Sequence, residues 1–365
     1  MTSQKSGEAE GLAWRRLIPL VLGAFTVAVE GTALTGVLPA LSTSLSVSAS
    51  TVGQVLAMYP VIYVVASPLL ALVVRSRRAC TIGLIVFAAG NLISASAQSV
   101  IVLALGRLVS AAGAALFIPN AGAQAVTLGK NRKGRALAVM SSGFTAATLA
   151  GAPLGVYVAS HLGWRWVLVA VAAMAVVVAA FQRADAPVSG MSIRDRFRFL
   201  GDRRMLAIVL LTVAVVAGEF VVYAYISLLV NDIALAMLVF GIGTTAGTLL
   251  GGFGVDRFGW SRMLAVSLAV TVCAMVSIPF IGMVGLAVWG VFGWMFTPAQ
   301  ANRLLTVFPD NGAMVLTLNS SAVQIGVAAG GFAGGIVLNV ASPTALPFVG
   351  AATVLVAAVV SRRVV

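Results

Sequence analysis

Three charged residues lie inside long apolar stretches of this sequence, where a charge has no ready access to water. Arg107 falls in the apolar run 101–124, and Glu30 and Glu219 lie in comparable runs. A charge at the centre of a bilayer costs at least about 2.5–3.5 kcal/mol, so each side chain should face protein or water and have a partner. Apolar surroundings favour a neutral carboxylic acid, whereas a nearby guanidinium favours its anion. Such an acid can exchange a proton for contact with Arg107 or with a cationic substrate.

We therefore predict that Glu30, Glu219 and Arg107 form a proton-coupling group in a shared, water-accessible cleft, with Glu30 ahead of Glu219 as the proton carrier. The alternative is that one acid neutralises Arg107 as a static pair. Both acids belong to polar stripes on otherwise apolar helices, because residues spaced by three, four or seven share a helix face. Thr26 lies on the stripe of Glu30, and Tyr223 and Ser227 lie on the stripe of Glu219. These three residues are candidates for the substrate-binding site.

The composition indicates that the segments carrying these three residues lie in a membrane. Of the 365 residues, 60% are hydrophobic and 9% are charged, whereas about 25% are charged in a typical soluble domain. Long unbroken apolar runs exclude a transmembrane β-barrel, whose strands alternate over short segments. We predict an all-α membrane protein with twelve transmembrane helices, at about 17–38, 50–73, 79–97, 101–124, 136–159, 164–182, 205–229, 233–254, 262–282, 284–302, 312–340 and 344–361.

The net charge of +13 comes from basic residues that are spread over alternate loops. Of the 23 lysines and arginines, all but Arg107 and Arg165 fit loops on one side, with Arg303 assigned to the loop after the tenth run. This positive-inside pattern predicts a multi-pass protein of the inner cell membrane with both termini in the cytoplasm. The charges form no single basic patch, so we do not expect nucleic-acid binding. Residues 1–16 lack the apolar centre of a cleavable signal, and the first run should remain as an anchor.

The one long polar connection, at 183–204, divides the chain into two halves. We predict a cytoplasmic tail at 1–16, a six-helix bundle at 17–182, a cytoplasmic linker at 183–204 and a second bundle with a short tail at 205–365. Glycines 151 and 155 recur at an offset of 180 as Gly331 and Gly335. Repeated halves place a transport site at their interface, near the middle of the membrane. Arginines in the linker should lie on the anionic inner leaflet, so membrane lipids are expected partners.

Six short segments occur in a characteristic order along the chain. They are GAFTVAVEGTALTGVLP (23–39), GRLVSAAGAALFIPNA (106–121), GAPLG (151–155), GWRW (163–166), GEFVVYAYI (218–226) and GGFGVDRFGWSR (251–262). In this order the chain resembles a twelve-span member of the major facilitator superfamily, in the drug:proton antiporter group close to sugar- and chloramphenicol-efflux permeases. The resemblance implies a pseudo-symmetric pair of six-helix bundles that exports a small amphipathic organic compound in exchange for protons by alternating access.

Two of these segments resemble family signatures with mechanical roles. Gly252, Asp256, Arg257 and Gly259 resemble the inner-loop signature, whose charge network holds the inward gate shut; the alternative is an ordinary solvated loop. The corresponding loop of the first half, 71–78, has no acidic residue, which puts the usual gate there in doubt. The second signature resembles the antiporter motif of span five, although plain close helix packing would select the same residues. It comprises Gly151, Pro153 and Gly155.

Aromatic and amide side chains at helical spacing are candidates for a substrate-binding wall. Apolar walls with a few polar groups suit medium-sized hydrophobic ligands, although such residues also serve as packing or lipid-facing positions. With Thr26, Tyr223 and Ser227, the candidates are Tyr59, Tyr63, Phe117, Asn120, Gln124, Trp289, Phe296, Ser320 and Gln324.

Several motifs of other protein classes are missing from the sequence. There is no P-loop and no nucleophile elbow, and one histidine with two separated cysteines offers no metal cluster. We therefore expect neither an enzyme nor a cofactor, and instead a monomer that handles a small-molecule substrate and protons. A proton-independent facilitator or exporter of sugars or other metabolites remains the alternative, and a channel or a non-transporting sensor is less favoured.

Overall fold

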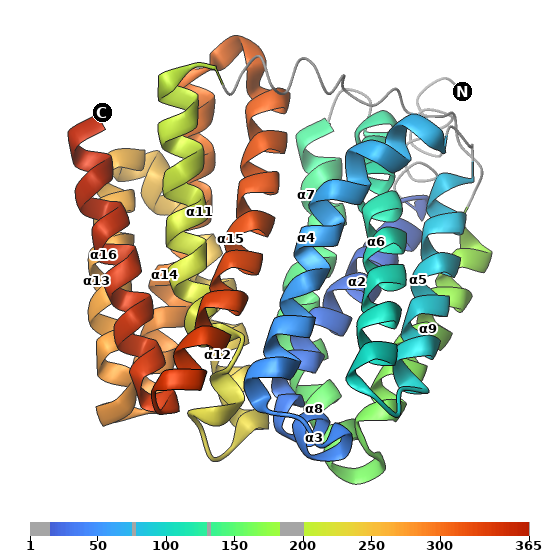
Figure 1. The fold of residues 1–365 in the computed structure, drawn as a ribbon. Coiled ribbons are helices and arrows are strands. Elements are labelled where there is room, and N and C mark those ends of the chain that lie inside the picture. Colours follow the sequence, from blue (N-terminus) through green and yellow to red (C-terminus); the bar gives the residue numbers. More distant parts are fainter. Residues whose placement is uncertain (1–14, 75–77, 130–132, 183–200, 365) are drawn as a thin grey trace, which may run out of the picture.

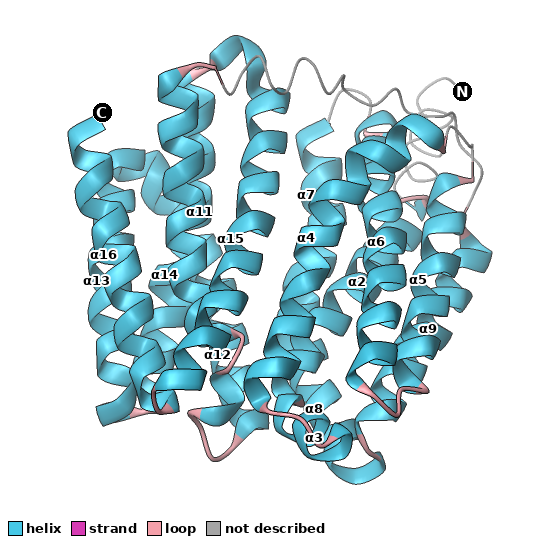
Figure 2. Cartoon of the chain, in the orientation of Figure 1, coloured by secondary structure: helices cyan, strands magenta, loops and turns pink. Residues whose placement is uncertain are grey.

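The computed structural model describes residues 15–74, 78–129, 133–182 and 201–364. Every regular element in these ranges is helical (Figure 2), which confirms the predicted all-α fold. Most of the linker at 183–204 lies outside the described residues, as do Arg75, Arg77, Lys130 and Arg132. The boundaries of the two halves thus remain a prediction.

The helices form two groups that stand side by side with their long axes roughly aligned (Figure 1). The first group contains α2 (Ile18–Gly36), α3 (Leu38–Leu45), α4 (Ala49–Val73), α5 (Ala79–Ala95), α6 (Val100–Leu128), α7 (Lys133–Ala146), the π-helix η2 (Ala147–Gly151), α8 (Ala152–Leu162) and α9 (Trp164–Phe181). The second contains α11 (Arg203–Tyr223), α12 (Ile233–Phe258), α13 (Trp260–Ile281), α14 (Met283–Val307), α15 (Gly312–Val340) and α16 (Leu346–Val364), with the 3-10 turns η3 (Ile226–Leu228), η4 (Pro309–Asn311) and η5 (Pro343–Ala345).

Ten helical segments in the described ranges are long and apolar enough to cross a membrane, and α7, η2 and α8 together count as one of them. The shorter apolar helix α5 has 17 residues. Helix α14 has 25 residues and continues past the predicted end of its run at residue 302. The assignment of Arg303 to a loop is therefore wrong, because this residue lies inside α14 and is 3% exposed.

Glycines bring neighbouring helices close together where the buried charges are held. On α5, Gly83 and Gly90 face the backbone of α6 around Gly113 and Ser110, so that a Cβ atom on either glycine would collide with it. Close approach through small residues is a common way to pack helices in a membrane, where lipid is as apolar as the protein. The α5–α6 contact fixes the face of α6 that carries Arg107.

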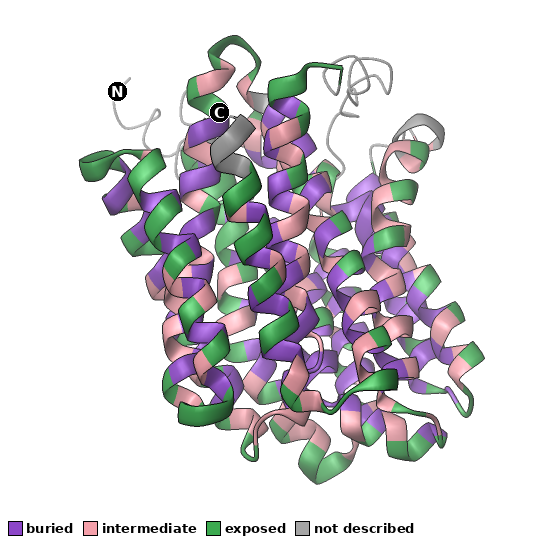
Figure 3. Ribbon diagram, turned by 60° about the vertical axis from the view of Figure 1, so that its left-hand side comes forward, coloured by how far each residue is buried: buried purple, intermediate pink, exposed green. Residues whose placement is uncertain are grey.

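The two groups meet through α4 and α15, which lie side by side (Figure 1). The Ser50 hydroxyl of α4 donates a hydrogen bond to the Gly335 carbonyl of α15 over 2.7 Å. Tyr225 of the second group packs its ring on Gly53 of α4, and its hydroxyl donates a hydrogen bond over 2.9 Å to the Gly331 carbonyl within its own group. A buried apolar cluster at the same end combines residues of both groups, including Leu38 and Tyr225. Purple segments along the inner faces of the helices in Figure 3 mark the buried residues, and green segments mark the exposed ones.

Removal of the Tyr225 hydroxyl tests the buried hydrogen bond that fixes this side chain on α15, beside the contact with α4. A buried hydrogen bond contributes about 1 kcal/mol to stability. We therefore expect Tyr225→Phe to lower the free energy of unfolding by about that amount, measured on purified protein in detergent. Tyr157→Phe is the matched control, because Tyr157 is 60% exposed. Equal stability of the two variants would contradict a structural role for the Tyr225 hydroxyl.

Candidate functional site

An ion pair lies inside the first helix group, between Arg107 on α6 and Glu30 on α2. Nη1 of Arg107 donates a hydrogen bond to Oε1 of Glu30. The side chains are 3% and 1% exposed, respectively. The pair therefore neutralises two charges at a position that is closed to bulk solvent.

The surroundings of the pair leave several polar atoms without partners. The guanidinium of Arg107 lies over the ring of Tyr59, 4.4 Å from its centroid, in the geometry of a cation–π contact. Within the described structure, Nε of Arg107, the Tyr59 hydroxyl and Oδ1 of Asn91 are buried and lack a hydrogen-bond partner. A fully satisfied pair would be a purely structural element, whereas this one sits among groups that can accept or donate further hydrogen bonds.

Glu219 on α11 lies in the second helix group and is 5% exposed. A Cβ atom added to Gly293 would lie 2.7 Å from Oε1 of Glu219 and 3.1 Å from Nε1 of Trp289. The carboxylate thus occupies the space that Gly293 leaves open, beside the indole. Neither this Oε1 nor this Nε1 has a hydrogen-bond partner in the described structure.

These positions correct one expectation from the sequence. The structure unites Glu30 with Arg107 in the first group, while Glu219 lies with Trp289 and Gly293 in the second. All three charged side chains are buried. They do not line one open, water-accessible cleft in this conformation, because each acid faces the interior of its own bundle.

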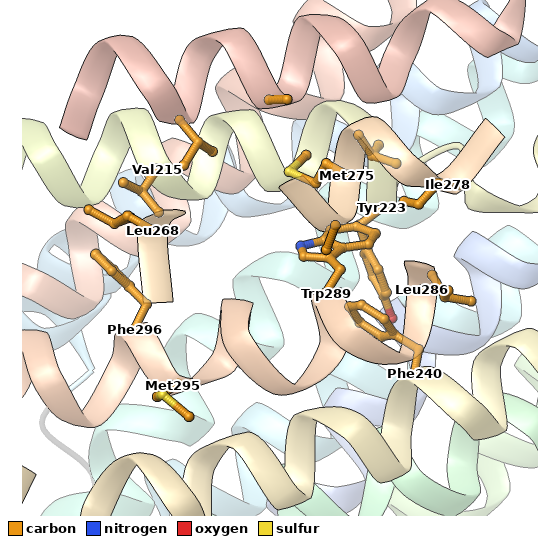
Figure 4. Packing of buried hydrophobic residues seen from close by; sticks show 14 of the residues in the cluster. Val215, Tyr223, Phe240, Leu268, Met275, Ile278, Leu286, Trp289, Met295 and Phe296 are labelled. Carbon is orange, nitrogen blue, oxygen red and sulfur yellow. The ribbon is translucent and has the colours of Figure 1, made fainter. Parts of the chain in front are cut away.

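Two aromatic candidates of the second group, Tyr223 and Trp289, both pack on Phe240, while Phe296 lies apart from them (Figure 4). Ring centroids of Tyr223 and Phe240 are 5.2 Å apart, and those of Phe240 and Trp289 are 4.8 Å apart. Tyr223, Trp289 and Phe296 are at most 6% exposed and belong to one apolar cluster. In this conformation they belong to the buried core of the second group rather than to an open binding wall, and Trp289 lies beside Glu219.

The other substrate-site candidates have varied surroundings. Phe117 is fully buried against Gly23 and Gly83, and the Thr26 hydroxyl is bonded to the Leu22 carbonyl of its own helix. The remaining candidates range from buried (Gln124, Ser227) through half-buried (Tyr63, Asn120, Gln324) to exposed (Ser320).

The residues resembling the antiporter motif lie at a deformed turn between the two groups. Gly151 ends the π-helix η2, and Pro153 lies in the first turn of α8. Gly151 packs against Val29 of α2, and Gly241 of α12 packs against the backbone of η2 at Thr148. π-Helical turns are often found at functional sites. This one contacts both α2 of the first group and α12 of the second.

The residues resembling the inner-loop signature belong to the end of α12 and not to a free loop. Asp256 and Arg257 are exposed in its last turn, and Gly259 has a φ of +79° where α12 gives way to α13. A Cβ atom on Gly252 would meet nothing within 4 Å. Among the described residues, Asp256 takes part in no ion pair, so the expected charge network is not formed in this conformation.

Sequence reasoning missed a buried polar network in the second group. Nε2 of Gln300 donates to the Thr212 hydroxyl over 2.8 Å, and that hydroxyl lies 2.8 Å from Oδ1 of Asn319. The three residues link α14, α11 and α15. Isolated polar residues within apolar runs were the available signal, but spacing within one helix does not reveal partners on another.

Comparison with known proteins identifies relatives along most of the chain. The model of the Major Facilitator Superfamily matches residues 20–309. The inner membrane transport protein YdhP of Escherichia coli O157:H7 is 27% identical over 345 residues, covering 88% of both chains. A chloramphenicol resistance protein of Streptomyces lividans is 30% identical over 263 residues, covering 66% of this chain and 67% of the relative.

Two solved structures share the fold. A bacterial homolog of the human lysosomal transporter Spinster, in an inward-facing and occupied conformation, aligns with a TM-score of 0.75 at 18% identity over 95% of this chain and 96% of that one. The nucleoside transporter NupG aligns with a TM-score of 0.76 at 14% identity over 96% and 98%.

The cost of separating the buried pair can be measured by substitution. Arg107→Met leaves the Glu30 carboxylate buried without its counter-charge, and loss of one partner of a buried pair costs about 3–5 kcal/mol. The double variant Arg107→Met with Glu30→Met should recover most of this loss, because no buried charge remains. Unfolding of the purified variants in detergent measures both effects. A double variant that is less stable than Arg107→Met alone would contradict the pairing.

Proposed function

The chain belongs to the major facilitator superfamily of membrane transporters, and from this premise we propose that it is a proton-coupled exporter of a small amphipathic organic compound. The family match confirms the resemblance expected from the sequence and makes the chain a multi-pass membrane transporter rather than an enzyme. Proton coupling, direction and substrate class are the proposal. The observation that carries it is the buried Glu30–Arg107 pair beneath Tyr59.

In the proposed cycle, a proton from outside binds a carboxylate oxygen of Glu30 and cancels its charge. The attraction between opposite charges is then lost, which weakens the hydrogen bond from Arg107 and allows the guanidinium to turn toward Tyr59 or another buried acceptor. Release of the proton to the cytoplasm restores the pair. When the proton is bound, the site carries the single positive charge of Arg107, and when it is released, the site is a neutral ion pair. This change in charge alters the affinity of the site for a polar or cationic substrate group.

Glu219 is the second proposed proton carrier. Its carboxylate lies beside Trp289 and Gly293. Among the described residues no cation forms an ion pair with it. A buried carboxylate anion without a partner is costly, and binding a proton removes that cost. Protonation of Glu219 would therefore be coupled to the packing of the aromatic cluster around Trp289.

Alternating access requires two helix groups that separate at one end while they close at the other. The hydrogen bond from Ser50 to the Gly335 carbonyl and the packing of the Tyr225 ring on Gly53 of α4 join the groups at the end proposed as outer. The π-helix η2 lies where α2 and α12 approach each other. We propose that these contacts open together, and that Asp256 and Arg257 form their charge network when the cytoplasmic end closes.

For an uncharged substrate, the membrane potential supplies enough free energy for this exchange. One elementary charge moved through 100 mV is worth about 2.3 kcal/mol. A tenfold concentration ratio costs about 1.4 kcal/mol, so one proton per cycle sustains a gradient between ten- and a hundredfold. The proposal places both termini in the cytoplasm and treats the carrier as a monomer.

Export of an organic compound is the choice best supported by the relatives. The Streptomyces lividans relative is named for chloramphenicol resistance, and export from the cell is the simplest way for a membrane transporter to protect against such a compound. The apolar surroundings of both acids suit a ligand with a large apolar part and one polar or cationic group.

The test uses inverted membrane vesicles with an imposed pH gradient, acidic inside, and a panel of amphipathic compounds that includes chloramphenicol. We expect accumulation with the wild type and none with Glu30→Gln, because the amide cannot exchange a proton. Asp310→Asn is the matched control, since Asp310 is an exposed acid on η4. Full accumulation by the Glu30→Gln variant would overturn the assignment of Glu30.

A proton uncoupler separates this function from a proton-independent facilitator. Collapse of the gradient should abolish accumulation if the carrier is proton-coupled. A facilitator would only equilibrate the compound, and its rate would not change with the uncoupler.

A further inference from the structure

Arg303 is a buried cation that the proposed cycle does not use. It lies near the C-terminal end of α14 and is 3% exposed. Its guanidinium carbon is 5.3 Å from the centre of the Trp260 ring, and its Nε has no hydrogen-bond partner in the described structure. Among the described residues no carboxylate pairs with it. A buried cation without an anion is costly, so the site calls for an anionic partner from outside the chain.

A groove on the second helix group is lined in part by this arginine. It lies between α11 and α16, has a volume of about 860 Å³, and is lined by the buried Arg303 and the exposed Arg203. The two helices touch at Gly218 and Gly350, where a Cβ atom on Gly218 would lie 2.7 Å from the Gly350 carbonyl. Toward the end where α11 begins, the two helices diverge (Figure 1), and the groove lies between them there.

The walls of the groove are apolar and face outward. Its rim carries Leu206, Leu210, Val356 and Val360, which are 41–62% exposed. From Arg203 to Ala214 the groove follows α11 for roughly 16 Å, at 1.5 Å per residue. That length is about half of the ~30 Å hydrocarbon core, or one leaflet of a bilayer.

A second groove reaches the same arginine from the other side of α16. It lies between α13 and α16, has a volume of about 440 Å³, and is lined by Trp260 and Leu268 as well as Arg303. Helix α16 is therefore flanked by two apolar grooves, and the unpaired Arg303 lines both of them. This arrangement matches a molecule with a negative head and apolar chains.

We infer that this is a binding site for an anionic phospholipid of the inner leaflet. The phosphate would be held by Arg303 and Arg203, and an acyl chain would lie along the groove between α11 and α16. Basic pockets between transmembrane helices on the cytoplasmic side bind anionic head groups in this manner. The leaflet follows from the proposed orientation of the termini, whereas the site itself depends only on the geometry of the second helix group.

Native mass spectrometry of delipidated protein in detergent tests the site, with phosphatidylglycerol as the probe and phosphatidylcholine as the neutral competitor. We expect the wild type to retain phosphatidylglycerol selectively. Arg303→Gln should weaken its binding at least about tenfold and Arg203→Gln about fivefold, because each removes one cation from the head-group site. Arg204→Gln is the matched control, since it removes the same charge from the same helix end but does not line the groove.

Two further measurements distinguish a lipid whose acyl chain occupies the groove from one that is held by charge attraction alone. Ala352→Phe fills the groove without changing a charge, and it should also weaken phosphatidylglycerol binding while the folded state is preserved. Inorganic phosphate at equal concentration should not displace the lipid. Equal binding by Arg303→Gln and the wild type would overturn the inference, as would equal losses for Arg203→Gln and Arg204→Gln or displacement by free phosphate.

Discussion

Burial of the Arg107 guanidinium against the Glu30 carboxylate is the interaction on which the first helix group depends, because either charge buried alone would be costly. The pair joins α6 to α2, and the Tyr59 ring adds α4. Glycines on α5 let that helix approach α6 closely and fix the face that carries Arg107. Charge neutralisation and close packing therefore act on the same residues, so a change in protonation at Glu30 is felt by at least three helices.

The second helix group contains buried charges without such a pair. Glu219 lies beside Trp289 with an unsatisfied oxygen, and Arg303 lies near the far end of α14 with an unsatisfied nitrogen. The two halves share an architecture but differ in electrostatics. A carboxylate that can take up a proton and a guanidinium that can take up an anion are two ways to relieve the same cost of burial.

Long apolar runs were enough to predict the helices, because their length follows from the thickness of the bilayer. The family was predicted from the order of the six short sequence segments, and the family match confirms it. Glu30 and Arg107 were also predictable, since a charge in an apolar run needs a partner. The sequence did not reveal that Glu219 lies apart from them, because partners on different helices depend on helix rotation. Arg303 was misassigned for a related reason. Its run ends in polar residues, which favoured a loop, while the helix continues to Val307.

The most direct test of the account is whether Glu30 exchanges a proton while the protein stays folded. Infrared difference spectroscopy during a pH titration of the purified transporter follows the C=O band of protonated carboxylic acids, and comparison with Glu30→Gln assigns the part due to Glu30. The account predicts a band that is missing from the variant and that grows as the pH falls within the folded range. A Glu30 carboxylate that stays ionised at every pH at which the protein is folded would make the pair with Arg107 a static one and contradict proton coupling through it.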